Sequence, residues 1–179
     1  MSNYPVLTIG HSTRSLDVFI ELLQENHVAI VIDIRTIPRS RHNPQFNIEN
    51  LPEALAKAGI EYQHWAGLGG LRHPRADSPN LGWRNESFRG FADYMQTAEF
   101  QSNLEALIKL AKEKIAALMC AESVPWRCHR SLIGDALTIR GITVADIIGP
   151  RNRRTHTLTA WARLNNGYVY YPPINLKKA

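Results

Sequence analysis

The sequence feature that most constrains the fold is an apolar run that leads through a cluster of reactive side chains into an amphipathic segment. Residues 115–119 are Ile-Ala-Ala-Leu-Met, which predicts a buried strand. Apolar residues then recur at the spacing of one helix face, at Leu132, Ile133, Ala136 and Leu137. Two cysteines, one histidine, two arginines and one glutamate lie between them, within Cys120–Arg130. Because open α/β sheets bind ligands where a strand turns into a helix, we expect a functional site at this turn.

The rest of the chain repeats the alternation of apolar strand and amphipathic helix. Strands are expected at Val6–Ile9, Ala29–Ile34, Glu61–Trp65, Ile115–Met119 and Thr143–Ile148. The apolar residues at 29–34 are continuous rather than alternating, which is typical of a parallel strand buried on both faces. Right-handed crossovers then favour a mostly parallel sheet. We therefore expect an α/β fold, a single domain with a mostly parallel sheet of about five strands and helices on both faces.

Two segments between the strands need separate comment. The segment 87–114 is helical in pattern, and Ser102 with Glu105 makes a capping box, which predicts a helix start inside it. Residues 66–86 contain glycines and prolines that interrupt every regular pattern. Irregular segments of about twenty residues are uncommon inside compact domains and are usually functional or disordered. We interpret this one as a lid over the site.

The chain after residue 149 differs in charge from the body. Residues 150–179 hold six basic residues and no acidic one, whereas residues 1–149 hold fifteen basic and sixteen acidic residues. Asn165-Asn-Gly167 favours a hairpin turn. We therefore divide the chain into an α/β domain at 1–149, which carries the site, and a basic C-terminal extension at 150–179, a hairpin packed on the body. The basic residues are Arg151, Arg153, Arg154, Arg163, Lys177 and Lys178.

The composition also bears on the cellular compartment. No apolar run approaches the ~20 residues that a bilayer span needs, and the N-terminus lacks the pattern of a secretory leader. Two cysteines in 179 residues are no disulfide framework, so reduced thiols are expected. These observations predict a cytoplasmic protein with no membrane partner.

Polar clusters follow three of the expected strands. The first strand ends in Gly10-His-Ser-Thr13, the second in Asp33-Ile-Arg35 and the fourth in Cys120-Ala-Glu122. The carboxyl ends of parallel strands lie at one edge of a sheet. We therefore expect these three clusters to meet at that edge.

The arginines near this edge indicate an anion site. Arg127 and Arg130 flank the expected start of a helix, where the helix dipole disfavours cations by about 0.3–1 kcal/mol each. Free backbone N–H groups and arginine forks both favour phosphate or carboxylate, so a bound anion would relieve this repulsion. The expected anion-binding residues are Ser12, Thr13, Arg35, Arg39, Arg127 and Arg130. The alternative is that Asp33 and Glu122 form structural ion pairs with Arg127 and Arg130.

The same surroundings indicate a reactive thiol. Cys128 lies beside a helix N-terminus and two arginines, a position that can lower a thiol pKa from about 8.5 towards about 4–7. Cys120, at the strand end, is the second candidate. His11 and His129 are the candidate acid–base groups, and His11 is the less constrained because it follows another strand. The alternative for each thiol is a small core residue. The carboxylates that would orient these groups are Glu122 and Asp33.

Two other kinds of site use the same residues. In a phosphatase-like loop an arginine follows the strand-end cysteine after six residues, but here that position is Trp126, and Pro125 stiffens the loop. A metal site could be built from Cys120, Cys128, His129 or His11. Seven residues separate the two cysteines, which is wider than the spacing of about two to four in structural zinc sites.

Several short stretches occur together in this chain: Thr8–Ser12, Asp33–Arg35, Pro38–Arg41, Pro44–Phe46, Leu68–Gly70, Cys120–Glu122 and Cys128–Arg130. In this combination the chain resembles, over nearly its full length, the domain-of-unknown-function family 488. The resemblance implies that these stretches belong together in one kind of protein. It implies no reaction.

We therefore expect an enzyme that depends on the cysteine, histidine and arginine cluster and acts on a phosphate-bearing ligand, either a nucleotide, a nucleic acid or a small phosphorylated molecule. One alternative is a non-catalytic nucleic-acid-binding protein, which would use the basic tail, the loop 35–42 and aromatic residues. Those aromatics are Trp161, Tyr168, Tyr170 and Tyr171, and they could instead pack the hairpin onto the body. A second alternative is a metal-binding protein. The sequence assigns no cofactor and no oligomeric state.

Overall fold

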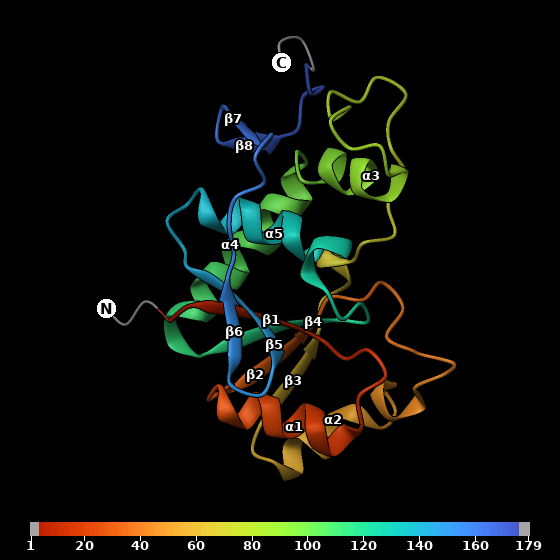
Figure 1. Ribbon diagram of the computed structural model, residues 1–179, viewed down its shortest axis with the longest axis vertical. Helices are drawn as coiled ribbons and strands as arrows, with labels where there is room; N and C mark the ends of the chain where they lie inside the picture. Colours follow the sequence, from red (N-terminus) through yellow and green to blue (C-terminus); the bar gives the residue numbers. More distant parts are fainter. Residues whose placement is uncertain (1–3, 176–179) are drawn as a thin grey trace.

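The computed structural model describes residues 4–175 and has a six-stranded sheet between layers of helices (Figure 1). The strands of this sheet are β1 (Val6–Gly10), β2 (Ile30–Asp33), β3 (Glu61–His64), β4 (Ala116–Cys120), β5 (Val144–Gly149) and β6 (Asn152–Thr155). Their order across the sheet is β3-β2-β4-β1-β5-β6. The first five strands pair in parallel, and β6 pairs with β5 in the antiparallel direction. The predicted α/β fold is confirmed, with one strand more than expected.

Helices cover both faces of the sheet, as predicted (Figure 1). α1 (Leu16–Glu25) and α2 (Leu51–Lys57) cover one face. α4 (Ala98–Glu113) and α5 (Arg130–Thr138) cover the other, and α3 (Glu86–Tyr94) lies farther from the sheet on that side. Within residues 4–175 no helix has both the length and the apolar character that a membrane crossing requires.

Each central strand contributes to two hydrophobic cores, because alternate side chains point to opposite faces. Leu118 of β4 packs in the core under α4 and α5, whereas Ala117 and Met119 pack in the core under α1 and α2. All three side chains are fully buried. Burial on both faces therefore explains why the apolar run at 115–119 is continuous.

The segment 87–114 forms two helices, but their boundary differs from the prediction. The hydroxyl of Thr97 accepts a hydrogen bond from Phe100 N (3.2 Å) and so caps α4. Ser102 lies inside α4, so the predicted capping box is wrong. The hydroxyl that precedes the helix decides where it begins, because it can reach a backbone N–H group that has no partner within the helix.

Residues 66–85 contain one 3-10 turn, η2 (Ala66–Leu68), and otherwise no regular element, and residue 86 begins α3. The carboxylate of Asp93 in α3 holds this loop at three points. It accepts hydrogen bonds from Arg75 N (2.8 Å), Ser78 Oγ (2.6 Å) and Asn80 Nδ2 (2.7 Å). The loop is therefore fastened to α3, and its function as a lid stays a prediction.

The C-terminal segment extends the sheet through β6 before it forms the predicted hairpin. β7 (Arg163–Asn165) and β8 (Tyr168–Tyr170) pair in the antiparallel direction. Asn166 and Gly167 between them have φ values of 49° and 82°, the conformation that a two-residue hairpin turn favours. Tyr171 is fully buried, and its hydroxyl donates a hydrogen bond to Asp135 of α5 (2.7 Å).

The structure describes some, but not all, of the basic residues of this C-terminal segment. Lys177 and Lys178 lie outside the described residues. Arg153 and Arg154 belong to β6 and are exposed. The division of the chain at residue 150 stays a prediction.

Candidate functional site at the carboxyl edge of the sheet

The carboxyl ends of β1, β2 and β4 are neighbours. Gly10 of β1 pairs with Cys120 of β4, and Asp33 of β2 pairs with Met119. Gly10 lies so close to the loop after β4 that an added Cβ atom would overlap the carbonyl oxygen of Glu122. The expected meeting of three strand ends is confirmed.

The side chain of Arg130, the first residue of α5, is buried at this edge and only 1% exposed. Its Nη1 donates to Cys120 Sγ (3.3 Å) and to the carbonyl oxygen of Glu122 (2.6 Å). Its Nη2 donates to the carbonyl oxygen of Ser123 (3.0 Å). No carboxylate in residues 4–175 forms an ion pair with Arg130. Because an uncompensated buried charge is costly, this guanidinium favours a negative charge on Cys120.

The pKa of Cys120 is lowered to about 7. A hydrogen bond from the Cys128 thiol lowers it most, and burial opposes this effect. The positive charge of Arg130 and the backbone N–H of Glu122 lower the pKa further. A thiol with this pKa is about half thiolate at neutral pH, and the thiolate is the nucleophilic form.

The pKa of the Cys128 thiol is shifted in the opposite direction. Burial, followed by the neighbouring Cys120, raises its pKa well above the ordinary value. The sequence suggested Cys128 as the first candidate for a lowered pKa, and the structure reverses that order. The physical reason is that burial has the largest effect on the pKa of Cys128, whereas the hydrogen bond from the Cys128 thiol has the largest effect on the pKa of Cys120. The guanidinium of Arg130 adds to this difference, because it donates to Cys120 Sγ (3.3 Å), whereas Cys128 Sγ accepts the backbone N–H of Arg130 (3.5 Å).

The ring of His129 lies between the second cysteine and the loop 66–86. His129 Nε2 is 2.9 Å from the carbonyl oxygen of Leu68, which can only accept, so Nε2 carries the hydrogen. Burial lowers the pKa of His129 to about 4. The neutral ring therefore presents Nδ1 as an acceptor, and Nδ1 lies 3.6 Å from Cys128 Sγ. Gly70 leaves room for this ring, because an added Cβ there would overlap it.

His11 lies in a different cluster. Its Nδ1 donates to the carbonyl oxygen of Ser12 (2.8 Å), and its Nε2 accepts from Arg35 Nη1 (3.3 Å). Burial lowers the pKa of His11, so the ring is neutral. Arg35 in turn binds both carboxylate oxygens of Asp33 (2.9 and 2.7 Å). Asp33 therefore pairs with Arg35, and within residues 4–175 neither Asp33 nor Glu122 forms the expected ion pair with Arg127 or Arg130. His11 contacts an arginine rather than a thiol.

Both cysteines line a pocket of about 350 Å³ that opens at this edge. Five other predicted site residues also line it: Arg35, Arg39, Glu122, Arg127 and His129. Apolar side chains on its wall include Ile37, Leu71 and Phe88, which the sequence analysis did not single out. The remaining predicted residues, His11, Ser12, Thr13, Asp33 and Arg130, lie off its wall.

The three arginines on the pocket wall differ in their hydrogen-bond and ion-pair partners. The guanidinium of Arg35 is committed to Asp33 and to the carbonyl oxygen of Phe46 (2.7 Å). Arg39 is exposed and pairs with Glu49 at the surface. Arg127 is exposed, and within residues 4–175 it forms no ion pair. Arg127 is therefore the cation most accessible to a ligand, and Arg39 is the second.

The N-terminus of α5 differs from expectation, because its first N–H groups are already occupied. A short 3-10 turn, η3 (Pro125–Arg127), leads into the helix. Ser131 N then donates to the carbonyl oxygen of Cys128 (3.0 Å), and Leu132 N donates to that of His129 (3.0 Å). Any anion at this site therefore depends on side chains rather than on helix N–H groups.

The geometry does not favour either a metal site or a phosphatase-like loop. Among residues 4–175, no group of three histidine, cysteine or acidic side chains is placed to hold a metal ion. In the loop after Cys120, the backbone N–H groups of Arg127 and Cys128 donate to the carbonyl oxygens of Val124 (3.2 Å) and Pro125 (3.0 Å). They are thus turned away from any phosphate above Cys120, unlike those of a phosphatase-like loop.

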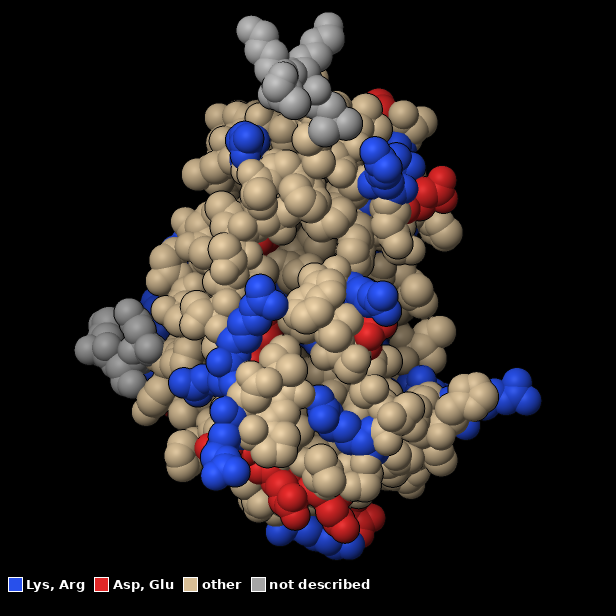
Figure 2. Space-filling model, viewed as in Figure 1, with Lys and Arg blue, Asp and Glu red and all other residues tan. Residues whose placement is uncertain are grey.

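The residues of the nucleic-acid alternative are also dispersed. Tyr171 is buried, and Trp161 packs against Trp83 with ring centroids 5.0 Å apart. Of the four aromatics proposed to stack on bases, Tyr168 is the most exposed, at 37%. Figure 2 shows basic side chains at separate places on one face rather than in one continuous surface.

Comparison with known proteins gives one positive result. No curated protein matches the chain, and no solved structure matches it. The sequence profile described as "Domain of unknown function DUF488" matches residues 15–137, a span that includes the strand-end Asp33 and Cys120 and the helix-start Arg130. Because this span is more than half of the 179-residue chain, the chain belongs to the DUF488 family.

Proposed function

We propose that this protein is a thiol-dependent enzyme in which the Cys120 thiolate attacks a small phosphate-bearing molecule held in the pocket. The observation that carries the proposal is the contact between Arg130 and Cys120. A buried guanidinium that forms no ion pair with any carboxylate of residues 4–175 donates to the sulfur of a thiol whose pKa is about 7. Structural cysteines are usually neutral core residues, whereas reactive cysteines lie in electropositive surroundings.

Ligand recognition would come from the pocket wall. Arg127 and Arg39 would bind the phosphate, because arginine forks match its oxygen atoms. The apolar side chains of Ile37, Leu71 and Phe88 would contact the rest of the molecule. A volume of about 350 Å³ suits a small molecule, since typical ligand pockets measure about 300–1,000 Å³.

In the proposed reaction, the sulfur of Cys120 forms a bond to an electrophilic atom of the ligand, and the leaving group departs with the electrons of the broken bond. Forming this bond removes the negative charge that accompanies Arg130. The covalent intermediate therefore leaves a buried cation uncompensated, which favours attack by water and return of the thiolate. Cys128 and His129 act as positioning residues, because the Cys128 thiol hydrogen-bonds the nucleophile and His129 contacts Cys128.

Alkylation of the native protein with iodoacetamide, mapped by peptide mass spectrometry, tests this proposal. We expect Cys120 to react before Cys128, with a rate midpoint near pH 7. Inorganic phosphate or pyrophosphate should slow the reaction. Arg127→Ala should remove this protection, whereas Arg41→Ala, which changes an exposed arginine off the pocket wall, should keep it. Absence of Cys120 labelling below about pH 8 would show that Cys120 is not the nucleophile. If neither phosphate nor pyrophosphate slows the labelling, the proposal that the ligand bears a phosphate is wrong.

A further inference from the structure

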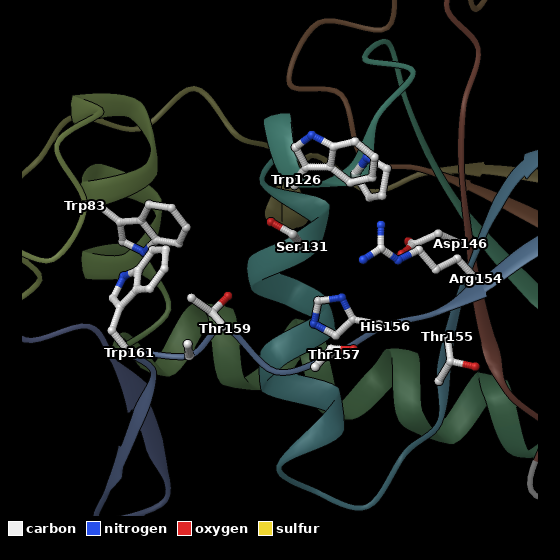
Figure 3. A pocket seen from close by; sticks show the side chains of 12 residues that line it. Trp83, Trp126, Ser131, Asp146, Arg154, Thr155, His156, Thr157, Thr159 and Trp161 are labelled. Carbon is white, nitrogen blue, oxygen red and sulfur yellow. The ribbon is translucent and has the colours of Figure 1, made fainter. Parts of the chain in front are cut away.

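A second cavity, of about 260 Å³, lies on the other side of the segment that carries the thiol site. Pro125, Trp126 and Ser131 belong to its wall, whereas Arg127, Cys128 and His129 face the thiol pocket. The opposite wall comes from β6 and from residues 156–161 (Figure 3). The function proposed for the thiol pocket uses none of the residues that line this cavity.

Three of the four tryptophans in the chain line this second cavity: Trp83, Trp126 and Trp161. Trp83 and Trp161 pack edge to face, with ring centroids 5.0 Å apart and planes at 66°. Their indole nitrogens are buried and have no hydrogen-bond partner within residues 4–175. Trp126 stands apart from this pair across the cavity and is 56% exposed (Figure 3).

The exposure of Trp126 is informative because burying a large aromatic side chain gains more free energy than burying most other side chains. Aromatic rings on two sides of a common space form a site for a flat ring, and the guanidinium of Arg154 lies over the Trp126 ring. The volume of about 260 Å³ is slightly below the usual range for whole ligands, about 300–1,000 Å³. The cavity therefore suits one ring system whose substituents extend to the opening.

Arg154 supplies a positive charge at the same opening. Its guanidinium lies 5.4 Å from the centroid of the Trp126 ring. It lies beside Asp146, its partner in the β5–β6 pairing, whose carboxylate accepts a hydrogen bond from the hydroxyl of Thr8 (Figure 3). Within residues 4–175, Arg154 forms no ion pair. The guanidinium is thus accessible to an anionic group on a ligand.

Hydroxyl groups complete the wall. Ser131, Thr155, Thr157 and Thr159 line the cavity. The Ser131 hydroxyl donates to the carbonyl oxygen of Cys128 (2.9 Å) and can only accept from a ligand, whereas a threonine hydroxyl can donate or accept. His156 is less available, because its Nε2 lies 2.8 Å from the carboxylate of Asp135. The cavity therefore combines aromatic faces, neutral hydrogen-bonding groups and one cation, which is the combination that a ring with polar edges and an anionic substituent requires.

We infer that this cavity binds a nucleoside monophosphate, with the base against the tryptophan rings and the phosphate at Arg154. Stacking of a base on an aromatic side chain accepts any base, so preference among bases would come from the hydroxyl groups. The inference does not depend on the reactivity of Cys120 and stands or falls separately from the thiol chemistry.

Tryptophan fluorescence offers a direct test, because Trp65 is the one tryptophan of the four that does not line the cavity. In the Trp65→Phe protein, all tryptophan emission reports on the cavity. Titration with AMP should give saturable quenching. Adenosine should bind about tenfold more weakly, the loss expected from one charged contact of about 1.4 kcal/mol. Inorganic phosphate alone should quench little.

Two further variants locate the ligand. Arg154→Ala should make AMP and adenosine bind equally, whereas Arg153→Ala, which changes the neighbouring exposed arginine of β6, should keep the difference. Trp126→Ala should weaken the binding of both ligands. Its side chain is more than half exposed, so the variant should fold, and circular dichroism would check this. Cys120→Ser should leave AMP binding unchanged. The inference is overturned if AMP gives no saturable quenching, or if the Arg154 and Trp126 variants bind AMP as the parent does.

Discussion

The guanidinium of Arg130 lies 3.3 Å from the sulfur of Cys120, and both side chains are buried. The two residues stand ten positions apart in sequence, one at the end of β4 and one at the start of α5. Because the arginine is held by two backbone carbonyl oxygens as well, it cannot turn away from the thiol without losing those hydrogen bonds. The strand-to-helix turn thus fixes a cation against a cysteine.

Replacement of the arginine tests this relationship. Arg130→Lys keeps the charge but loses the forked geometry, so we expect the pKa of Cys120 to rise and its alkylation at pH 7 to slow by about tenfold. The variant should also lose about 1–3 kcal/mol of stability, because buried carbonyl oxygens lose their donors. Arg140→Lys, at the other end of α5, is the matched control. An unchanged pH midpoint in Arg130→Lys would show that the guanidinium does not set the thiol pKa.

The mutual effect of the two cysteines on their pKa values, and their position on the wall of one pocket, predict a reversible disulfide. Oxidation of the native protein with diamide should remove both free thiols together, with the loss of two hydrogens in the intact mass. Cys120 should be the attacking sulfur, because it has the lower pKa. Cys128→Ser should therefore still react with a small disulfide reagent at pH 7, and Cys120→Ser should react slowly. Equal reactivity of the two single variants would contradict this order.

The close approach of β1 to the loop after β4 predicts a sensitive glycine. Gly10→Ala would place a methyl group on the carbonyl oxygen of Glu122, so we expect a loss of about 1–3 kcal/mol or more in the free energy of unfolding. Gly149→Ala is the control, because no atom lies within 4 Å of its added Cβ. Urea denaturation of both variants makes the comparison. Similar midpoints would mean that this edge of the sheet can relax.

The buried histidine predicts how stability depends on pH. The pKa of His129 is about 4 in the folded protein, whereas the unfolded value is about 6.5, so the unfolded chain binds more protons between these values. Stability should therefore fall as the pH drops through this window, by about 2 kcal/mol between pH 7 and pH 5. His129→Gln should reduce the dependence, and exposed His42→Gln should not. His11 acts in the same direction, so a smaller slope should remain.

The features that the sequence predicts well are those that depend on local pattern. The continuous apolar runs locate the parallel strands, and the polar residues after them locate the edge where Gly10, Asp33 and Cys120 meet. The turn at Asn166 and Gly167 follows from residues that tolerate positive φ. Each of these depends on residues close together in the chain.

The features that the sequence misses depend on distance and direction. Nothing in the sequence shows that the guanidinium of Arg130 points to Cys120 rather than to Cys128, or that His11 contacts Arg35. Those contacts are decided by the direction of side chains from separate elements. The sixth strand was missed because its residues, Asn152–Thr155, are all exposed and polar, and only pairing with β5 makes them a strand.

The two outer strands of the sheet are unequal. β6 is antiparallel to β5 at one side of the sheet, whereas on the other side, within residues 4–175, no strand pairs with the outer edge of β3. β3 is four residues long, and its first residue, Glu61, forms an ion pair with Lys114. Short, charged outer strands resist pairing with a second molecule. The polarity of β3 therefore disfavours edge-to-edge pairing, and apolar substitutions on that strand should promote aggregation before they impair folding.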